Sequence, residues 1–172
     1  SNIDKLTMYD AWIGSLAYTL QLYFDFSAYS EMAIGLGLMF NYNLPLNFNL
    51  PYRSCSIIEF WRRWHMTLSA FLKNYLYIPL GGNRTGHHLR NIMITMFLGG
   101  LWHGAGWTFI VWGCLHGIFI CINHVWRKTK IIIPKALCWF LTFNAVNLAW
   151  VFFRADDILG AFRIISTMFD IC

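Results

Sequence analysis

The stretch from Asn91 to Trp126 contains no Asp, Glu, Lys or Arg, and it constrains the fold more than any other feature of the chain. A helix needs only about 20 apolar residues to cross the hydrocarbon core of a bilayer. The stretch is therefore too long for one crossing and too short for two full ones. Glycines interrupt it at Gly99-Gly100 and at Gly104-Ala105-Gly106, where a helix is disfavoured. The pattern predicts a broken helix at membrane depth.

Composition indicates an integral membrane protein. Only 12% of the 172 residues are charged and 58% are hydrophobic, whereas an average soluble domain has about 25% charged residues. The net charge of +5 fits basic loops beside a membrane surface, because the basic residues flank apolar segments. We therefore expect an all-α, polytopic transmembrane protein whose partner is the lipid bilayer and not a nucleic acid.

Apolar segments predict the other helices. Ala11 to Phe24 and Met32 to Phe40 form either one long helix with a polar interruption or two short ones. Asn41 to Pro51, with four asparagines and two prolines, is typical of an extended loop. Trp107 to Trp126 and Ala136 to Phe153 are each long enough to span a bilayer. The residues from 154 to 172 are predicted to form a terminal surface helix.

We treat residues 1–172 as a single membrane-embedded region. The chain begins without a signal peptide or an initiator methionine, so we expect it to be part of a longer protein. Basic residues cluster at 53–90 and at 127–135, and both clusters favour the cytoplasmic side. A re-entrant segment over residues 91–103, which enters the membrane without crossing it, would reconcile the two.

An amphipathic helix is predicted after Ser56, a candidate N-cap with Glu59 three positions later. Its apolar residues recur at spacings of three and four: Phe60, Trp61, Trp64, Leu68, Phe71 and Leu72. Together with the nearby basic residues, this suits a helix at the membrane interface. His65 falls on the side that can face the protein interior. By itself it is equally well explained as an interfacial histidine.

His103 is the main candidate for chemistry. The alternative is a buried histidine that only bonds a backbone carbonyl. An ionisable side chain at a break in a membrane helix, however, favours a functional site. Neutral imidazole, whose ordinary pKa lies near 6.5, suits removal of a proton from a hydroxyl at neutral pH. We therefore predict that His103 is a general base.

Other polar groups are weaker candidates. The loop Gly81-Gly82-Asn83-Arg84 is able to hold an anionic group through Arg84 and backbone amides, although such turns are common. His116 and His124 lie eight residues apart with no carboxylate nearby, so we predict no metal site. The five cysteines form no C-x-x-C pair, and we interpret them as membrane-buried thiols without disulfides.

Two motifs together carry a highly specific resemblance to a known family. They are Glu59-Phe-Trp-Arg-Arg-Trp-His65-Met-Thr-Leu-Ser69 and Gly99-Gly-Leu-Trp-His103-Gly-Ala105, with Pro79-Leu-Gly-Gly-Asn-Arg84 between them. They closely resemble the membrane-bound O-acyltransferase (MBOAT) family. The segments 25–35 and 150–156 look like its bacterial alginate O-acetylation branch. The clear resemblance covers roughly Phe24 to Arg127.

The resemblance implies a fold, a reaction and a location. His103 would be the essential histidine of the family and His65 its second. The reaction would be transfer of acetyl groups from a cytoplasmic thioester, acetyl-CoA or a similar donor reached through a tunnel, to hydroxyls of an extracytoplasmic polysaccharide. No bound cofactor is implied. A periplasmic acetyltransferase would be a partner, the chain would lie in the bacterial inner membrane as a multi-pass protein, and further spans would precede it.

The chemistry of the residues agrees with acyl transfer. Besides the base His103, the reaction needs hydrogen-bond donors for the developing oxyanion. The indole of Trp102, or the backbone amides of Gly104 and Ala105, are candidates. Two other functions remain open. One is D-alanyl transfer to teichoic acid by the same fold, and the loop Pro79 to Arg84 favours acetylation over it. The other is a transporter with a substrate site at its broken helix.

Overall fold

The computed structural model describes residues 6–84, 86–129 and 131–169, and this part of the chain is helical, without β-strands. The elements are α1 (Met8–Met39), η2 (Pro51–Arg53), α2 (Ile57–Trp61), α3 (Met66–Leu72), η3 (Lys73–Tyr77), α4 (His88–His103), α5 (Trp107–Thr129), α6 (Lys135–Arg154) and α7 (Ile158–Met168). The all-α prediction is confirmed.

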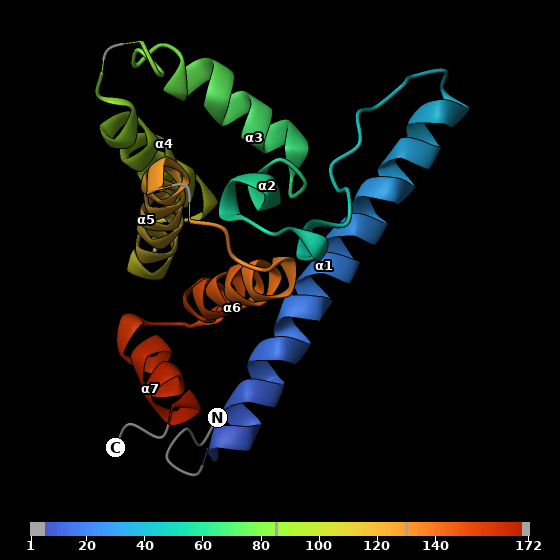
Figure 1. The fold of residues 1–172 in the computed structure, drawn as a ribbon. Helices are drawn as coiled ribbons and strands as arrows, with labels where there is room; N and C mark the ends of the chain where they lie inside the picture. The colour runs from blue at the N-terminus through green and yellow to red at the C-terminus, as the bar shows by residue number, and fades with distance from the viewer. Residues whose placement is uncertain (1–5, 85, 130, 170–172) are drawn as a thin grey trace.

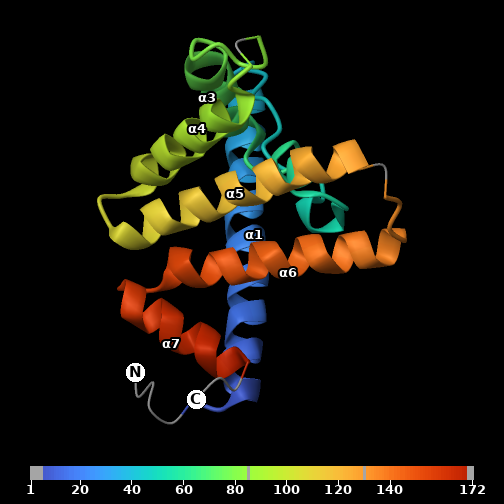
Figure 2. The same ribbon diagram turned by 60° about the vertical axis from the view of Figure 1, so that its left-hand side comes forward.

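The long helix α1 forms one side of the molecule, and α6 and α7 pack against it (Figure 1). Seen after a 60° turn, α4, α5, α6 and α7 follow one another in a zigzag stack in front of α1 (Figure 2). The short helices α2 and α3 lie between α1 and the α4–α5 pair. Segments at both ends of the chain therefore surround the middle segment that carries His65.

One continuous helix spans the N-terminal segment, which settles the alternative that the sequence left open. Thr7 caps it, because its hydroxyl accepts a bond from the Asp10 backbone N–H while the Asp10 side chain accepts one from the Thr7 backbone. Deeper in α1, the hydroxyls of Ser15 and Thr19 donate to Oδ1 of Asn147 on α6, at 3.0 and 2.7 Å. These buried bonds join α1 to α6.

The predicted break at Gly99-Gly100 is wrong, because α4 continues through both glycines to His103. These positions instead let α4 and α5 come together. A Cβ on Gly100 would collide with the carbonyl oxygen of Phe109, and one on Gly113 with that of Met96. The second predicted break is confirmed, because α4 ends at His103 and α5 begins at Trp107.

The predicted single amphipathic helix is wrong as well. The segment forms two short helices, α2 and α3, separated at residues 62–65. Ser56 caps α2 by accepting a bond from the Glu59 N–H, as predicted. His65 then adopts a left-handed conformation, with φ 42° and ψ 59°, which no α-helix accommodates. His65 nevertheless faces the protein interior, where it lines a cavity together with Leu68.

Two helices in the described part, α5 and α6, are long and apolar enough to cross a membrane. They match the two predicted spans closely. The segment from 41 to 50 is extended and α7 lies in the predicted terminal segment, so both expectations are confirmed. Among the described residues, Cys55, Cys114, Cys121 and Cys138 are free and half-buried, whereas Cys172 lies outside the described residues.

Candidate active site

His103 is the last residue of α4 and projects into an aromatic environment. Its ring packs edge-on against Trp102, Trp112 and Phe153, with centroid distances of 5.0, 5.1 and 5.3 Å. The helix ends here because Gly104 follows in an extended conformation. A Cβ on Gly104 would lie 2.7 Å from the ring of Phe109. Glycine at position 104 therefore allows the ring of Phe109 to pack closely against the backbone that follows His103.

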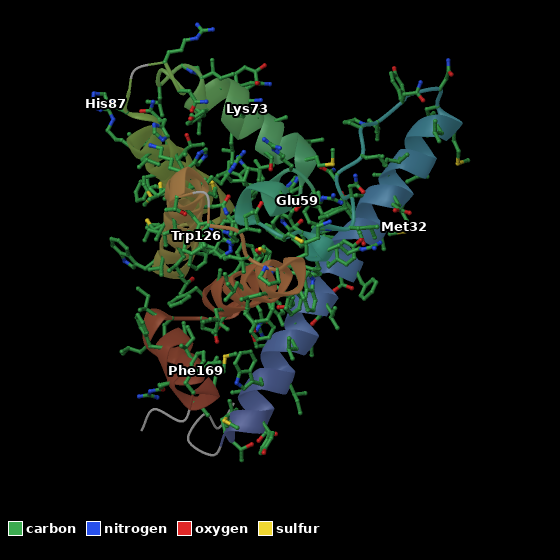
Figure 3. The ribbon with its side chains drawn as sticks, viewed as in Figure 1. Met32, Glu59, Lys73, His87, Trp126 and Phe169 are labelled. Carbon is green, nitrogen blue, oxygen red and sulfur yellow. The ribbon has the colours of Figure 1, made fainter. Side chains whose placement is uncertain are left out.

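His65 reaches the same region from the turn between α2 and α3. Its ring packs edge-on against Phe26 of α1, with the centroids 4.8 Å apart. Its Nδ1 lies 3.3 Å from Oδ1 of Asn47, in the extended loop that follows α1. Figure 3 shows Glu59, on α2 just before this turn, between Met32 on α1 and Trp126 on α5. His65 is thus contacted by two other segments of the chain, helix α1 and the loop that follows it.

The two histidines line one small cavity of about 40 Å³. Every other side chain around it is apolar or aromatic: Leu22, Phe26, Trp61, Trp64, Leu68, Trp112, Trp150 and Phe153. Imidazoles are the only basic groups there, and water has little room. The structure therefore brings together His65 and His103, the two histidines for which the sequence analysis predicts a catalytic role.

A cleft of about 330 Å³ adjoins this cavity, because Trp61 lines both. Four of its lining residues carry basic side chains: Arg62, Lys73, His124 and Arg127. Its apolar lining residues include Leu72, Ile92 and Ile120. A cleft lined by both basic and apolar side chains suits a long ligand with an anionic end.

A third cavity, of about 350 Å³, also borders His65. His65 and Phe26 line both this cavity and the small one. Its polar lining groups belong to Tyr29, Ser30, Asn47 and Thr67. The small cavity thus shares Trp61 with the basic cleft, and it shares His65 and Phe26 with the third cavity.

A further cavity, of about 430 Å³, lies elsewhere, between α1, α6 and α7. Its charged lining residues are Asp10, Arg154, Asp156 and Asp157. Asp10 and Asp157 both cap helices there. This cavity contains neither candidate histidine, so we do not assign chemistry to it.

The remaining predicted site residues lie farther from the histidine cavity. The Trp102 side chain is 62% exposed and is not among the residues that line the cavity. The Gly104 N–H donates to the carbonyl of Leu101, 3.3 Å away. Asn83 lines the basic cleft, where its Oδ1 accepts a bond from the Tyr77 hydroxyl. Arg84 is exposed in the same loop and does not line the cleft.

The other histidines have different surroundings. His116 is fully buried, and its Nδ1 accepts a hydrogen bond from the Trp61 indole at 3.3 Å. His124 lines the basic cleft with its ring 5.7 Å from that of His88. His87, by contrast, is exposed (Figure 3). Within the described ranges, no group of three His, Cys, Asp or Glu side chains is placed to hold a metal ion.

Sequence reasoning missed Asn47 and the contact of Trp61 with two cavities. Asn47 is one of four asparagines in the same loop, and nothing in the sequence distinguishes it from the other three. The sequence pattern predicts Trp61 on an apolar helix face. Only its position in three dimensions reveals that it touches two cavities.

Known proteins match the chain as follows. The model of the membrane-bound O-acyltransferase family, MBOAT, matches residues 3–130. A peptidoglycan O-acetyltransferase of Helicobacter pylori is 54% identical over 170 residues, which cover 95% of this chain and 32% of that protein. A probable alginate O-acetylase of Azotobacter vinelandii is 55% identical over 165 residues, 93% of this chain and 33% of that protein.

A more distant relative is the teichoic acid D-alanyltransferase of Streptococcus thermophilus. It is 34% identical over 162 residues, which cover 79% of this chain and 39% of that protein. The chain spans about a third of the length of the first two relatives.

Proposed function

This chain belongs to the membrane-bound O-acyltransferase family, and on that basis we propose that it carries the histidine site of an enzyme that moves acetyl groups from a thioester to polysaccharide hydroxyls. The strongest support is that His65 and His103 line one cavity enclosed by aromatic side chains. Such walls hold water away from a thioester, and an imidazole can remove the proton of an alcohol.

The reaction at this site balances as follows. The hydroxyl oxygen of the acceptor attacks the carbonyl carbon of the thioester, and the hydroxyl proton passes to the imidazole of His103. The carbon–sulfur bond then breaks. The proton returns from His103 to the leaving thiolate, so the products are an ester and a thiol. His65 assists from the opposite wall of the cavity.

The donor enters through the basic cleft in this proposal. Acetyl-CoA, or another acyl thioester with phosphate groups, has an anionic end for Arg62, Lys73 and Arg127. Its thioester end would reach the histidines past Trp61, which lines both cavities. Asn83, which lines the cleft, is proposed to help bind the donor, and the neighbouring Arg84, whose side chain lies outside the cleft, is proposed to contribute only weakly. Trp102 and the Gly104 segment remain proposed donors to the oxyanion.

The acceptor is a polysaccharide and approaches from the other side, through the cavity that His65 shares with Tyr29 and Ser30. The relatives named as acting on alginate and on peptidoglycan are both more than 50% identical to this chain, and the D-alanyltransferase is 34% identical. Acetylation of a glycan is therefore favoured over D-alanylation. A periplasmic acetyltransferase partner would complete the transfer.

We place the protein in the bacterial inner membrane with several crossings. The end of α5 carries Arg127 and Lys128, and α6 begins at Lys135. Basic residues at membrane ends favour the cytoplasm. This orientation makes the basic cleft, which Arg127 lines, accessible to a cytoplasmic donor.

Mass analysis of surface polysaccharides tests the proposal directly. Deleting the gene should remove O-acetyl groups, and wild-type protein should restore them. His103→Ala should insert normally yet restore none, and His65→Ala should restore few. The exposed His87→Ala is the matched control and should behave as wild type. Unchanged acetylation after deletion would reject the function, and loss of D-alanyl esters instead would identify the other acyl group.

A further inference from the structure

The side chain of Asn47 contacts the turn that presents His65. We propose that Asn47 is a positioning residue, which holds the His65 imidazole with its proton on Nδ1 and leaves Nε2 as the accepting nitrogen in the cavity shared with His103. This inference rests on the proposed function and adds to it the protonation pattern of the second histidine.

The orientation of the Asn47 amide follows from its partners. The backbone N–H of Thr67 donates to Oδ1 of Asn47 at 3.3 Å, and the Thr67 hydroxyl lies 2.7 Å from the same atom. A backbone N–H can only donate, so the shared atom must be the amide oxygen and not the nitrogen.

The tautomer of His65 follows from that orientation. Its Nδ1 lies 3.3 Å from the same amide oxygen. An oxygen without a proton can only accept, so Nδ1 must carry the hydrogen. A neutral imidazole has one ring proton, and Nε2 is therefore left with a free lone pair. Asn47 lines the third cavity and not the small one, so this bond holds the ring from the side of the proposed acceptor cavity.

The backbone reinforces the same contact. The N–H of Met66 donates to the carbonyl of Asn47 at 2.9 Å, and the N–H of Asn49 donates to the carbonyl of Arg63 at 3.0 Å. Between them His65 has φ 42°, which is unfavourable for a residue with a side chain. Such a conformation persists only where surrounding contacts enforce it, and it is common at functional sites.

The tautomer decides how His65 can act. When His103 takes the hydroxyl proton, it becomes an imidazolium. A lone pair on Nε2 of His65 would stabilise that positive charge, whereas an N–H at the same place would repel it. The proton still returns to the leaving thiolate, so the balance of the reaction is unchanged.

Variants of Asn47 test this role in the full-length protein in its membrane. Asn47→Ala removes the acceptor and should lower kcat about 10- to 100-fold with little change in KM for the thioester. Asn47→Asp keeps an acceptor and should restore much of kcat. Its carboxylate also stabilises protonated His65, so the acid limb of the pH profile should move to higher pH by about one unit.

Asn43→Ala is the matched control, because Asn43 is exposed in the same extended segment. It should leave kcat and the pH profile unchanged. A merely structural role for Asn47 would lower the amount of folded protein equally for Ala and Asp and leave the pH profile in place. Wild-type kcat in Asn47→Ala would overturn the proposal.

The tautomer can be measured without activity. Solid-state NMR of protein in lipid, labelled with ¹⁵N-histidine, should show His65 protonated at Nδ1, with its signal identified by its loss in His65→Gln. Asn47→Ala should lose that preference. A wild-type ring protonated at Nε2 would refute the inference. If wild-type protein transfers no acyl group but shows the Nδ1 proton, the proposed function fails while the assignment of Asn47 to this tautomer stands.

Discussion

The indole Nε1 of Trp61 donates a hydrogen bond to Nδ1 of His116, 3.3 Å away. His116 is fully buried on α5, and Trp61 is the last residue of α2. Because Trp61 lines both the basic cleft and the histidine cavity, this bond fixes a side chain that the two spaces share. His116 lines neither space itself, so it acts on them only through Trp61.

The bond between Trp61 and His116 can be measured by a double-mutant cycle. His116→Leu and Trp61→Phe should each destabilise the protein, and the coupling free energy between them should be about 1 kcal/mol. Thermal unfolding in detergent gives the four stabilities. Trp61→Phe combined with the exposed His87→Leu is the control cycle and should be additive. Additivity in the first cycle as well would show that the bond contributes nothing.

The basic cleft should set the affinity for the thioester donor. Arg127→Ala should raise KM for an acyl thioester about 10-fold, because a charge-assisted bond to an anion is worth about 1.5–3 kcal/mol. The effect should shrink at high salt. Lys128, the next residue, is exposed and does not line the cleft, so Lys128→Ala should leave KM unchanged. Equal effects of the two substitutions would point to general surface charge.

Arg84 lies beside the donor cleft without lining it. The loop composition predicts that Arg84 binds an anionic group, whereas the structure places its side chain outside the cleft. We expect Arg84→Ala to change KM for the donor less than twofold. The same kinetic assay decides the question, since a rise as large as that of Arg127→Ala would restore the prediction made from the loop.

The close approach of α4 and α5 depends on glycine. Gly100→Ala and Gly113→Ala should each lower the free energy of unfolding by about 1–3 kcal/mol, because the new methyl group meets backbone of the facing helix. Gly35→Ala is the control, since a Cβ there meets open space. That change should be neutral or stabilising by up to about 1 kcal/mol. Thermal unfolding that ranks Gly35→Ala with the other two would contradict the packing argument.

The buried amide of Asn147 should matter for joining α1 to α6. Asn147→Leu leaves the hydroxyls of Ser15 and Thr19 without their acceptor and should cost about 1–3 kcal/mol. Asn144 is one turn earlier on α6 and bonds only to its own helix, at the Phe140 carbonyl, so Asn144→Leu serves as the control. The unfolding temperature of Asn147→Leu should be lower than that of Asn144→Leu. Equal unfolding temperatures would contradict this role of Asn147.

The sequence could predict the spans and the two histidines because their signals are local. An uncharged run marks α5 and α6, and histidines in such surroundings stand out. The broken helix at His65 could not be predicted, since the apolar spacing from Phe60 to Leu72 continues without interruption. The left-handed turn is imposed by backbone bonds to Asn47 and Asn49, which are distant in sequence.

The glycines show the same limit. Gly99-Gly100 and Gly104-Ala105-Gly106 look alike as helix breakers, yet only the second ends a helix. Packing against α5 explains Gly100, and a sequence pattern contains no information about which facing helix will approach. Propensity is a weak guide wherever a tertiary contact demands a residue without a side chain.

The backbone at His65 also inverts an ordinary rule of mutagenesis. A site normally tolerates alanine better than glycine. At φ 42° this order of stability reverses, because only glycine avoids the steric cost of about 1 kcal/mol. The Gly variant should therefore melt later than the Ala variant, while both lack the imidazole. Glycine therefore removes the imidazole with less distortion of the backbone than alanine does. Comparing the Gly and Ala variants separates the loss of chemistry from the distortion of the turn.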